Sequence, residues 1–187
     1  VSGKPFWEAM GFVNTGEQSP ENKLDIYEKD VLYPIFENGE LLPLSQETVA
    51  EISEWEYEAP FDAYSFKGHN DEYLLDESIW GIEQFRLTCD GIILGQVACQ
   101  YEGDDLWVGW SMAPELTGQG NGAAYVSRCI QEIRRVKGHT GRILLRVSSR
   151  NVRAIKAYQK AGFRYTKTIQ DEIAFSNNME EFWVMEQ

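Results

Sequence analysis

Three runs rich in apolar and aromatic residues lie in the middle of the chain, and residues that favour turns bound each of them. The runs extend from Gln84 to Thr88, from Ile92 to Gln100 and from Leu106 to Met112. Asp90-Gly91 separates the first two runs, and a turn that begins at Gly103 separates the second from the third. This pattern predicts three β-strands that pair through antiparallel hairpins.

The apolar residues change to a helical spacing after the third strand. Val126, Ile130 and Ile133 recur at intervals of about one helical turn between Gly122 and Val136, which predicts a helix over this segment. The residues from Ile143 to Val147 form a short apolar run, and we expect a strand there.

A second helix is predicted from Asn151 to Ala161, because Asn151 is a favourable N-cap and Gly162 lies just past the helix end. A final strand is predicted from Phe182 to Met185. Strands joined by hairpins, then helix, strand, helix and strand, are the order of an α+β fold. We therefore expect a mixed, mostly antiparallel central sheet flanked by helices in three α/β/α layers.

The region before the first strand is predicted to contain one clear helix. Ser45 is placed to cap it, and Val49 and Ile52 lie on one of its faces. Residues 55–66 are rich in aromatic side chains and are interrupted by Pro60, which predicts short helices and loops.

Residues 33–42 contain Pro34 and Asn38-Gly39 and are predicted to be a linker or a turn. We therefore expect an N-terminal segment, residues 1–40, and a main domain, residues 41–187. A short internal similarity relates the two: Phe6, Trp7 and Met10-Gly11-Phe12 match Ala157, Tyr158 and Ala161-Gly162-Phe163, and residues 23–29 match residues 181–185. The similarity is either the remnant of a duplicated domain or the chance likeness of two amphipathic helices that end in Gly-Phe.

Charge is distributed unevenly along the 187 residues, whose net charge is −13. Residues 117–170 hold twelve Lys and Arg but one acid, Glu132, which is a balance of +11, and the rest of the chain has a balance of −24. One interpretation is that the basic segment faces an anionic cofactor while the acidic remainder attracts a cationic substrate. The other is that these charges only solvate the surface. The overall sign disfavours a nucleic-acid partner.

Cysteine and histidine residues give no sign of a metal site or a disulfide framework. Cys89, Cys99 and Cys129 are odd in number and widely spaced, and His69 and His139 lack ligand spacing. We expect ordinary buried thiols and no metal. The sequence has no apolar run long enough to cross a membrane and no secretory leader, so we expect no membrane partner and a cytoplasmic location.

Glycine alternates with other residues at Gly118, Gly120 and Gly122, between the third strand and the first long helix. Such a turn leaves backbone N–H groups unpaired at a helix N-terminus, where the helix dipole also favours an anion. A diphosphate is the natural ligand of such a turn.

The glycine turn and the following Asn-capped helix resemble two motifs of the GNAT N-acetyltransferase superfamily. The first motif reads Arg/Gln-x-x-Gly-x-Gly/Ala, and this chain departs from it by having Thr117 at the first position. The second, Asn-x-Arg-Ala-Ile-x-x-Tyr-x-Lys-x-Gly-Phe, is matched by Asn151, Arg153, Ala154, Ile155, Tyr158, Lys160, Gly162 and Phe163. The N-terminal segment likewise resembles the tail of a second GNAT domain.

The resemblance implies transfer of an acetyl group from acetyl-CoA to a primary amine, without a metal ion. It implies that Met112 or Ala113 offers a backbone N–H to the thioester carbonyl, and that Tyr158 protonates the departing sulfur. The residues implied to bind the cofactor are Met112, Ala113, Thr117, Gly118, Gln119, Gly120, Asn121, Gly122, Ala123 and Asn151.

The amine acceptor is implied to bind near residues 55–66, where Trp55, Tyr57 and Tyr64 are candidate substrate contacts. These aromatic side chains could equally fill the core. The acceptor itself is open among a polyamine, an aminoglycoside, an amino acid and a protein N-terminus, and a homodimer is possible. The sequence assigns no general base, although Glu83, Glu102, Asp104 and Asp105 lie near the strands.

Two other classes of protein are compatible with parts of the sequence. Gly118-x-Gly120-x-x-Ala123 fits a dinucleotide-binding fingerprint, but no suitable acid follows at the ribose position. The stronger alternative is a non-catalytic acyl-CoA-binding module, because Thr117 departs from the motif and no base is evident.

Overall fold

A computed structural model describes residues 13–19, 25–28, 34–68, 71–172 and 179–187 of the chain. The chain divides into two compact units, Val1–Leu32 and Tyr33–Gln187. In the first unit, β1 (Val13–Gln18) pairs with β2 (Asp25–Glu28) as an antiparallel two-stranded sheet. The residues at positions 6–12 that show internal similarity lie outside the described residues, so their origin stays a prediction.

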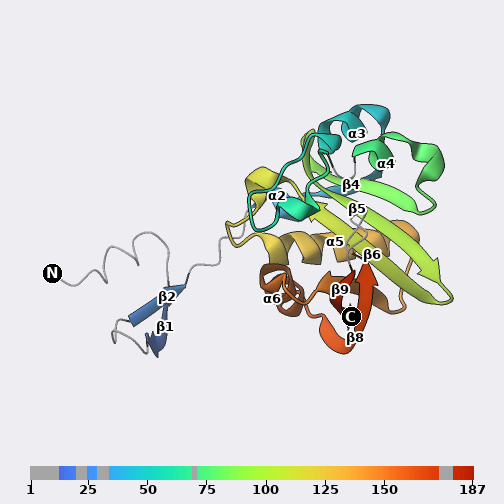
Figure 1. Ribbon diagram of the computed structural model, residues 1–187. Coiled ribbons are helices and arrows are strands. Elements are labelled where there is room, and N and C mark those ends of the chain that lie inside the picture. Colours follow the sequence, from blue (N-terminus) through green and yellow to red (C-terminus); the bar gives the residue numbers. More distant parts are fainter. Residues whose placement is uncertain (1–12, 20–24, 29–33, 69–70, 173–178) are drawn as a thin grey trace. The chain divides into compact units, whose positions relative to one another are not determined.

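The second unit is built on a seven-stranded sheet in the order β3-β4-β5-β6-β7-β9-β8. Neighbouring strands run antiparallel except for the parallel pair β6 and β7, so the predicted mixed, mostly antiparallel sheet is confirmed (Figure 1). The strands are β3 (Glu40–Pro43), β4 (Glu83–Cys89), β5 (Ile92–Glu102), β6 (Asp105–Met112), β7 (Ile143–Ser148), β8 (Arg164–Glu172) and β9 (Met179–Glu186).

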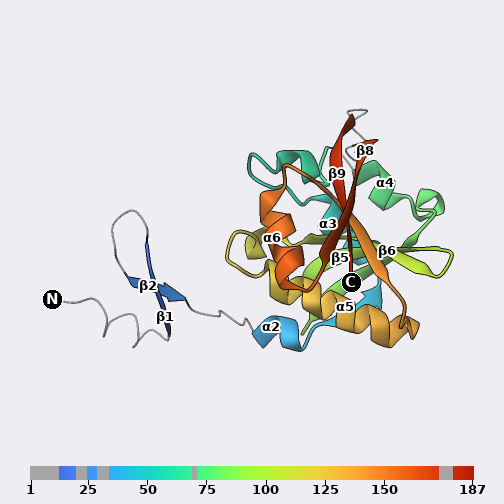
Figure 2. The same cartoon turned by 90° about the horizontal axis from the view of Figure 1, so that it is seen from below.

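Helices cover both faces of this sheet, as Figures 1 and 2 show. Helices α5 (Gly122–Lys137) and α6 (Val152–Lys160) lie on one face, with the short α2 (Pro34–Glu37) beside α5. Helices α3 (Gln46–Ser53) and α4 (Asp71–Leu75) lie on the other. Short 3₁₀ turns are η1 (Asp62–Tyr64), η2 (Glu77–Ile79) and η3 (Pro114–Leu116).

Each face has its own hydrophobic core. The larger core joins β4 to β7 with α5 and α6, and its fully buried members include Ile133, Leu145 and Met185. The smaller core joins α3 and α4 to β5 through Ile52, Leu74 and Ile93. Two separate cores on opposite faces of one sheet make the three layers that the sequence predicts.

The predicted helix boundaries follow from their capping residues. Ser45 and Thr48 form a capping box at the start of α3, and the Asn151 side chain accepts a hydrogen bond of 3.1 Å from Ala154 N at the start of α6. Helix α5 ends at Gly138, which has a φ of 62°. A left-handed residue at this position is the common way for a helix to stop, and glycine adopts it without strain.

The expectation of a linker or a turn over residues 33–42 is wrong for most of this range, because its described residues form α2 and β3 with only a short turn between them. Phe36 and Leu41 are each 2% exposed and belong to the larger core. Glu132 of α5, itself 3% exposed, accepts a hydrogen bond from Leu41 N and forms ion pairs with Arg128 and Arg135. This buried carboxylate, with its partners, anchors β3 to the domain. The turn residues Pro34 and Asn38-Gly39 give no sign of such a long-range contact.

Gly95 of β5 has a packing role that leads to a stability prediction. A Cβ atom at this position would lie 2.2 Å from the hydroxyl of Tyr125, a residue that is 2% exposed. This hydroxyl lies 3.0 Å from both Gln96 O and Ser111 O, which share its one proton. We expect Gly95→Ala to lower the free energy of unfolding by about 1–3 kcal/mol, because the core is overpacked. Urea unfolding should show no such loss for Gly109→Ala, since nothing lies within 4 Å of a Cβ at that strand position. Equal stability of the two variants would contradict this role.

Candidate active site

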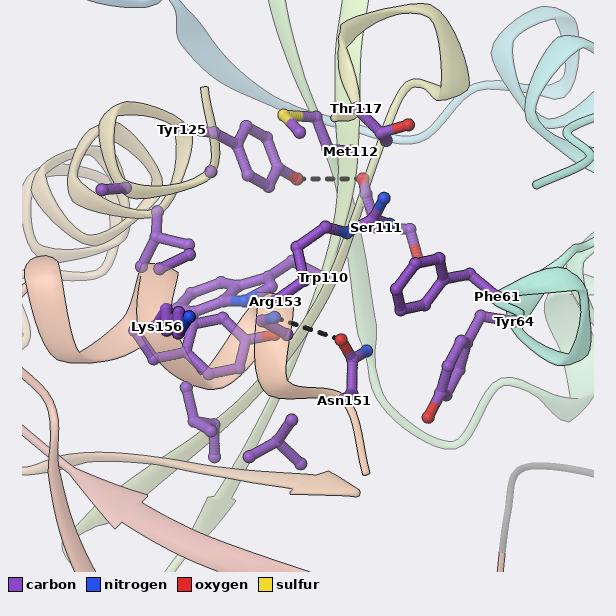
Figure 3. Close-up of a pocket in the computed structure, with 18 of the residues that line it drawn as sticks. Phe61, Tyr64, Trp110, Ser111, Met112, Thr117, Tyr125, Asn151, Arg153 and Lys156 are labelled. Carbon is purple, nitrogen blue, oxygen red and sulfur yellow. Dashed lines mark hydrogen bonds between the residues drawn. The ribbon is translucent and has the colours of Figure 1, made fainter. Parts of the chain in front are cut away.

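Strands β6 and β7 pair at only one end. Their parallel register joins Leu106 to Ile143 and Trp107 to Leu144, and beyond these residues the structure gives no further pairs between the two strands. The rest of β6 therefore presents one side of its backbone to an opening in the middle of the sheet. The loop that follows β6, the first turn of α5, and α6 surround this opening (Figure 3).

The register of β5 and β6 decides which peptide group faces the opening. Ala113 N–H donates a 3.0 Å hydrogen bond to Leu94 O, so it is already paired with β5. Residues in an antiparallel pair alternate between facing the partner strand and facing away, so the peptide groups of Met112 point away from β5. Met112 O accepts a 2.8 Å hydrogen bond from the Tyr57 hydroxyl, in agreement with this direction. Of the two alternatives, it is the Met112 N–H that is available to a ligand in the opening. The prediction that Ala113 contacts the cofactor is therefore wrong, because its N–H is bonded to β5 and the residue does not line the cavity.

A cavity of about 510 Å³ fills the opening. The structure brings most of the predicted site residues to its wall: Met112, Thr117, Gly118, Gly120, Asn121, Gly122, Ala123, Asn151, Tyr158, Tyr57 and Tyr64. Gln119 does not line the cavity, because its side chain folds back and donates a 2.5 Å hydrogen bond to Glu115 O.

The glycine turn is held open by its own side chains. Thr117 Oγ1 donates to Pro114 O at 2.8 Å, and Asn121 Nδ2 donates to Leu116 O at 2.9 Å. Gly118 and Gly120 have φ angles of +73° and +80°, and nothing lies within 4 Å of a Cβ at either position. Within the described part of the chain, the N–H groups of Gly118 and Gly120 have no acceptor. The turn therefore presents unpaired donors at the N-terminus of α5, as a diphosphate requires.

The charge of the cavity wall is positive. Arg146, Arg153, Lys156 and Lys160 line it, and no Asp or Glu is among the described residues that do so. The acids considered as bases lie elsewhere, since Glu83 pairs with Lys137, Asp105 pairs with Arg142 at 2.7 Å, and neither Glu102 nor Asp104 lines the cavity. Unpaired N–H donors and a basic wall fit coenzyme A. Among the described residues of this wall, no carboxylate can serve as the base.

Tyr158 projects from α6 into the cavity wall. Its ring packs against Trp110 and Phe163, with centroids 6.0 and 6.1 Å away. Burial raises the pKa of the Tyr158 hydroxyl to about 12, although the nearby Trp110 side chain opposes the shift. The phenol therefore stays protonated at neutral pH and can donate a proton to a thiolate.

The acceptor side of the cavity is formed by residues 57–64. Tyr57, Phe61 and Tyr64 line it, and Figure 3 shows Phe61 and Tyr64 across the cavity from Lys156. Trp55 does not, because it is 7% exposed and packs edge-on against Phe66 in the smaller core. This placement corrects the assignment of Trp55 as a substrate contact: it is one of the aromatic residues that fill the core.

Sequence reasoning missed the pairing of Phe61 with Arg153. The Arg153 guanidinium lies 3.8 Å from the centroid of the Phe61 ring, so a loop residue and an α6 residue meet at the cavity. Arg153 was visible as a member of the second motif and Phe61 as a member of the aromatic stretch, but nothing in the sequence indicates their contact.

The comparison with protein families decides the identity of this fold and site. Residues 47–163, more than half of the chain, match the model of the acetyltransferase (GNAT) family. The chain belongs to the GNAT acetyltransferase family. As a GNAT member it is an acyltransferase that uses acetyl-CoA, and the dinucleotide-binding interpretation of the glycine turn is dropped.

Solved GNAT structures share the fold at low sequence identity. Spermidine N-acetyltransferase from Vibrio cholerae, solved with CoA and spermine, is 17% identical over 81% of this chain and 95% of that one, with a TM-score of 0.62. The aminoglycoside acetyltransferase AAC(6')-Ib, solved with paromomycin and acetyl-CoA, is 16% identical over 80% and 93% of the chains, with a TM-score of 0.63. A GNAT acetyltransferase from Bacillus anthracis is 13% identical over 79% and 92%, with a TM-score of 0.60. No curated protein matches the sequence.

Three further findings concern the residues that the structure describes. None of the helices in the described residues is long and apolar enough to span a membrane. The same residues hold no group of three or more His, Cys, Asp or Glu placed to bind a metal ion. Cys89, Cys99 and Cys129 are buried free thiols.

Proposed function

We propose that this GNAT protein transfers an acetyl group directly from acetyl-CoA to a primary amine of a small cationic molecule. The observation that carries the proposal is the opening between β6 and β7, which has the glycine turn at one end and Tyr158 in its wall. A ligand bound by its diphosphate at the turn can extend along β6 toward the phenol.

Each of the chain's own groups has a defined role in this proposal. The free N–H groups of Gly118 and Gly120 bind the diphosphate, and Met112 N–H donates to the carbonyl of the thioester. The Tyr158 hydroxyl donates its proton to the sulfur as the sulfur leaves. Bound acetyl-CoA supplies the activated acetyl group. The amine loses its proton through water, since the described wall lacks a carboxylate.

Negative charge beside residues 57–64 supports a cationic acceptor. Glu56 and Glu58 line two hollows next to the main cavity, of about 420 and 510 Å³. Asp62 and Lys67 also line the larger hollow, and Arg153 lines the smaller one, so acids outnumber bases in both. Tyr57 borders the main cavity and both hollows, so a cationic amine that follows the acids reaches the main cavity. Spermine and paromomycin, bound in the similar structures, are polycations of this kind. A protein N-terminus is the less favoured acceptor.

The test is release of CoA from acetyl-CoA with a panel of polyamines, aminoglycosides, amino acids and N-terminal peptides. We expect turnover with at least one polyamine or aminoglycoside, and none with its fully N-methylated analogue, which keeps the charge but lacks a reactive amine. Tight binding of acetyl-CoA without turnover of any amine would instead establish a non-catalytic acyl-CoA-binding module. Turnover confined to peptides would overturn the small-molecule acceptor.

A further inference from the structure

The phosphate-binding turn of this protein has no cationic or long polar side chain at its first position. Thr117 stands there, and its hydroxyl hydrogen bonds to Pro114 O. The turn itself therefore offers only backbone N–H groups to a diphosphate, and these donate hydrogen bonds but carry no charge. A cation from another element is therefore expected near the turn.

Arg153 lies where such a cation is needed. It belongs to the first turn of α6 and lines the main cavity. It also lines the neighbouring hollow, with Thr117 and Gly118 beside it and with Glu56 and Glu58 also in the wall. None of the ion pairs among the described residues involves Arg153. Its charge also acts on the cleft: burial raises the pKa of Tyr57, and the nearby Arg153 charge opposes that increase.

The contact with Phe61 leaves the donors of Arg153 available. The guanidinium lies over the ring at 3.8 Å from the centroid, and Figure 3 shows both residues at the cavity. A cation–π contact uses none of the guanidinium N–H groups, and among the described residues these groups have no hydrogen-bond acceptor. Planar paired donors match two oxygens of a phosphate group.

We infer that Arg153 is the side chain that binds the diphosphate of coenzyme A in this protein, in place of the residue missing at position 117, and that Phe61 holds its guanidinium there. The inference rests on the proposed function, because it assumes that acetyl-CoA occupies the cavity. It assigns Arg153 to binding and leaves proton transfer to Tyr158.

The first test measures binding without turnover. By isothermal titration, Arg153→Gln should raise the Kd of CoA by about 10- to 100-fold, the range expected for losing hydrogen bonds to a charged group. The same increase should persist with dephospho-CoA, which keeps the diphosphate but lacks the 3′-phosphate. Arg164→Gln, a change at an exposed arginine of β8 outside the cavity, should leave the Kd unchanged. Loss of the effect with dephospho-CoA would move Arg153 to the 3′-phosphate and overturn the assignment.

Two further variants test whether Arg153 takes the place of a cation at position 117 and whether the Phe61 ring holds its guanidinium. Thr117→Arg in the Arg153→Gln background should restore CoA affinity by at least about 5-fold, because it returns a cation to the motif position. Phe61→Leu should raise the Kd by about 2- to 5-fold through loss of the cation–π contact. Failure of Thr117→Arg to rescue binding would refute the idea that Arg153 replaces this position.

Acetyl-pantetheine, which lacks every phosphate, separates this inference from the proposed function. Its kcat/KM should be the same in the wild type and in Arg153→Gln, whereas a merely structural arginine would lower it. If the wild type binds CoA and acetylates an amine but Arg153→Gln binds CoA normally, only the role of Arg153 fails. If the wild type does not bind CoA, the proposed function fails with it.

Discussion

Tyr158→Phe is expected to lower kcat by about 10²- to 10⁴-fold while leaving the Kd of acetyl-CoA nearly unchanged. The change removes one hydroxyl and keeps the ring that packs against Trp110 and Phe163, so the fold should be retained. The Tyr158 hydroxyl has a pKa of about 12 and is protonated at neutral pH, so the variant loses the proton that this group would donate to the departing sulfur. Steady-state kinetics with a saturating amine, together with titration of acetyl-CoA, would measure both quantities.

Tyr165→Phe is the matched control for this experiment. Tyr165 is 49% exposed on β8, and its hydroxyl contacts only Thr168 Oγ1, at 3.1 Å, among the described residues. The control should keep the wild-type kcat. A Tyr158→Phe enzyme with unchanged kcat would remove this hydroxyl from the mechanism, and an equal loss in Tyr165→Phe would point to a general effect on the fold.

Gly120→Val is expected to raise the Kd of CoA by about 100-fold or more. Valine would place a branched side chain beside the N–H groups of the turn. A β-branched residue also rarely adopts the φ of +80° that Gly120 has in the turn. Losing two hydrogen bonds to a charged diphosphate accounts for an effect of this size. Calorimetric titration of CoA measures it directly.

Gly91→Val provides a control with the same backbone strain. Gly91 also has a φ of +80° and an empty surrounding, but it lies in the turn between β4 and β5, away from the cavity. Both variants should lose similar stability, of about 1–2 kcal/mol, on thermal unfolding. Only Gly120→Val should lose CoA binding, and normal CoA affinity in that variant would show that the turn does not hold the diphosphate.

The elements that sequence patterns predicted well are those with one buried face. Helices α5 and α6 and strands β4 to β7 carry periodic apolar residues, and Asn151 and Gly138 fix the helix ends. Strand β8 was missed because nearly all of its side chains are exposed, so it has no alternating pattern, and it pairs with β9 mainly through its backbone. Strand β3 was missed because the partner of its Leu41 N–H is Glu132, far away in the sequence.

The same distinction applies to the site. The glycine turn and Tyr158 are placed by local motifs, and the structure brings them to one cavity. The choice between Met112 and Ala113 depends on strand register, which the sequence does not contain. Trp55 and Tyr64 look alike in the sequence, yet one fills the core and the other faces the cavity, because only tertiary packing separates them.

The short parallel ladder between β6 and β7 has a consequence for how the protein responds to its own cofactor. Four strands on one side and three on the other are joined at the centre by two residue pairs, and α5 bridges the remainder. A ligand bound in that gap stabilises the folded state, because it binds the folded chain and not the unfolded one. At a free concentration 100 times its Kd, such a ligand adds about 2.7 kcal/mol to the stability. The folded fraction of this enzyme is therefore linked to the supply of its cofactor.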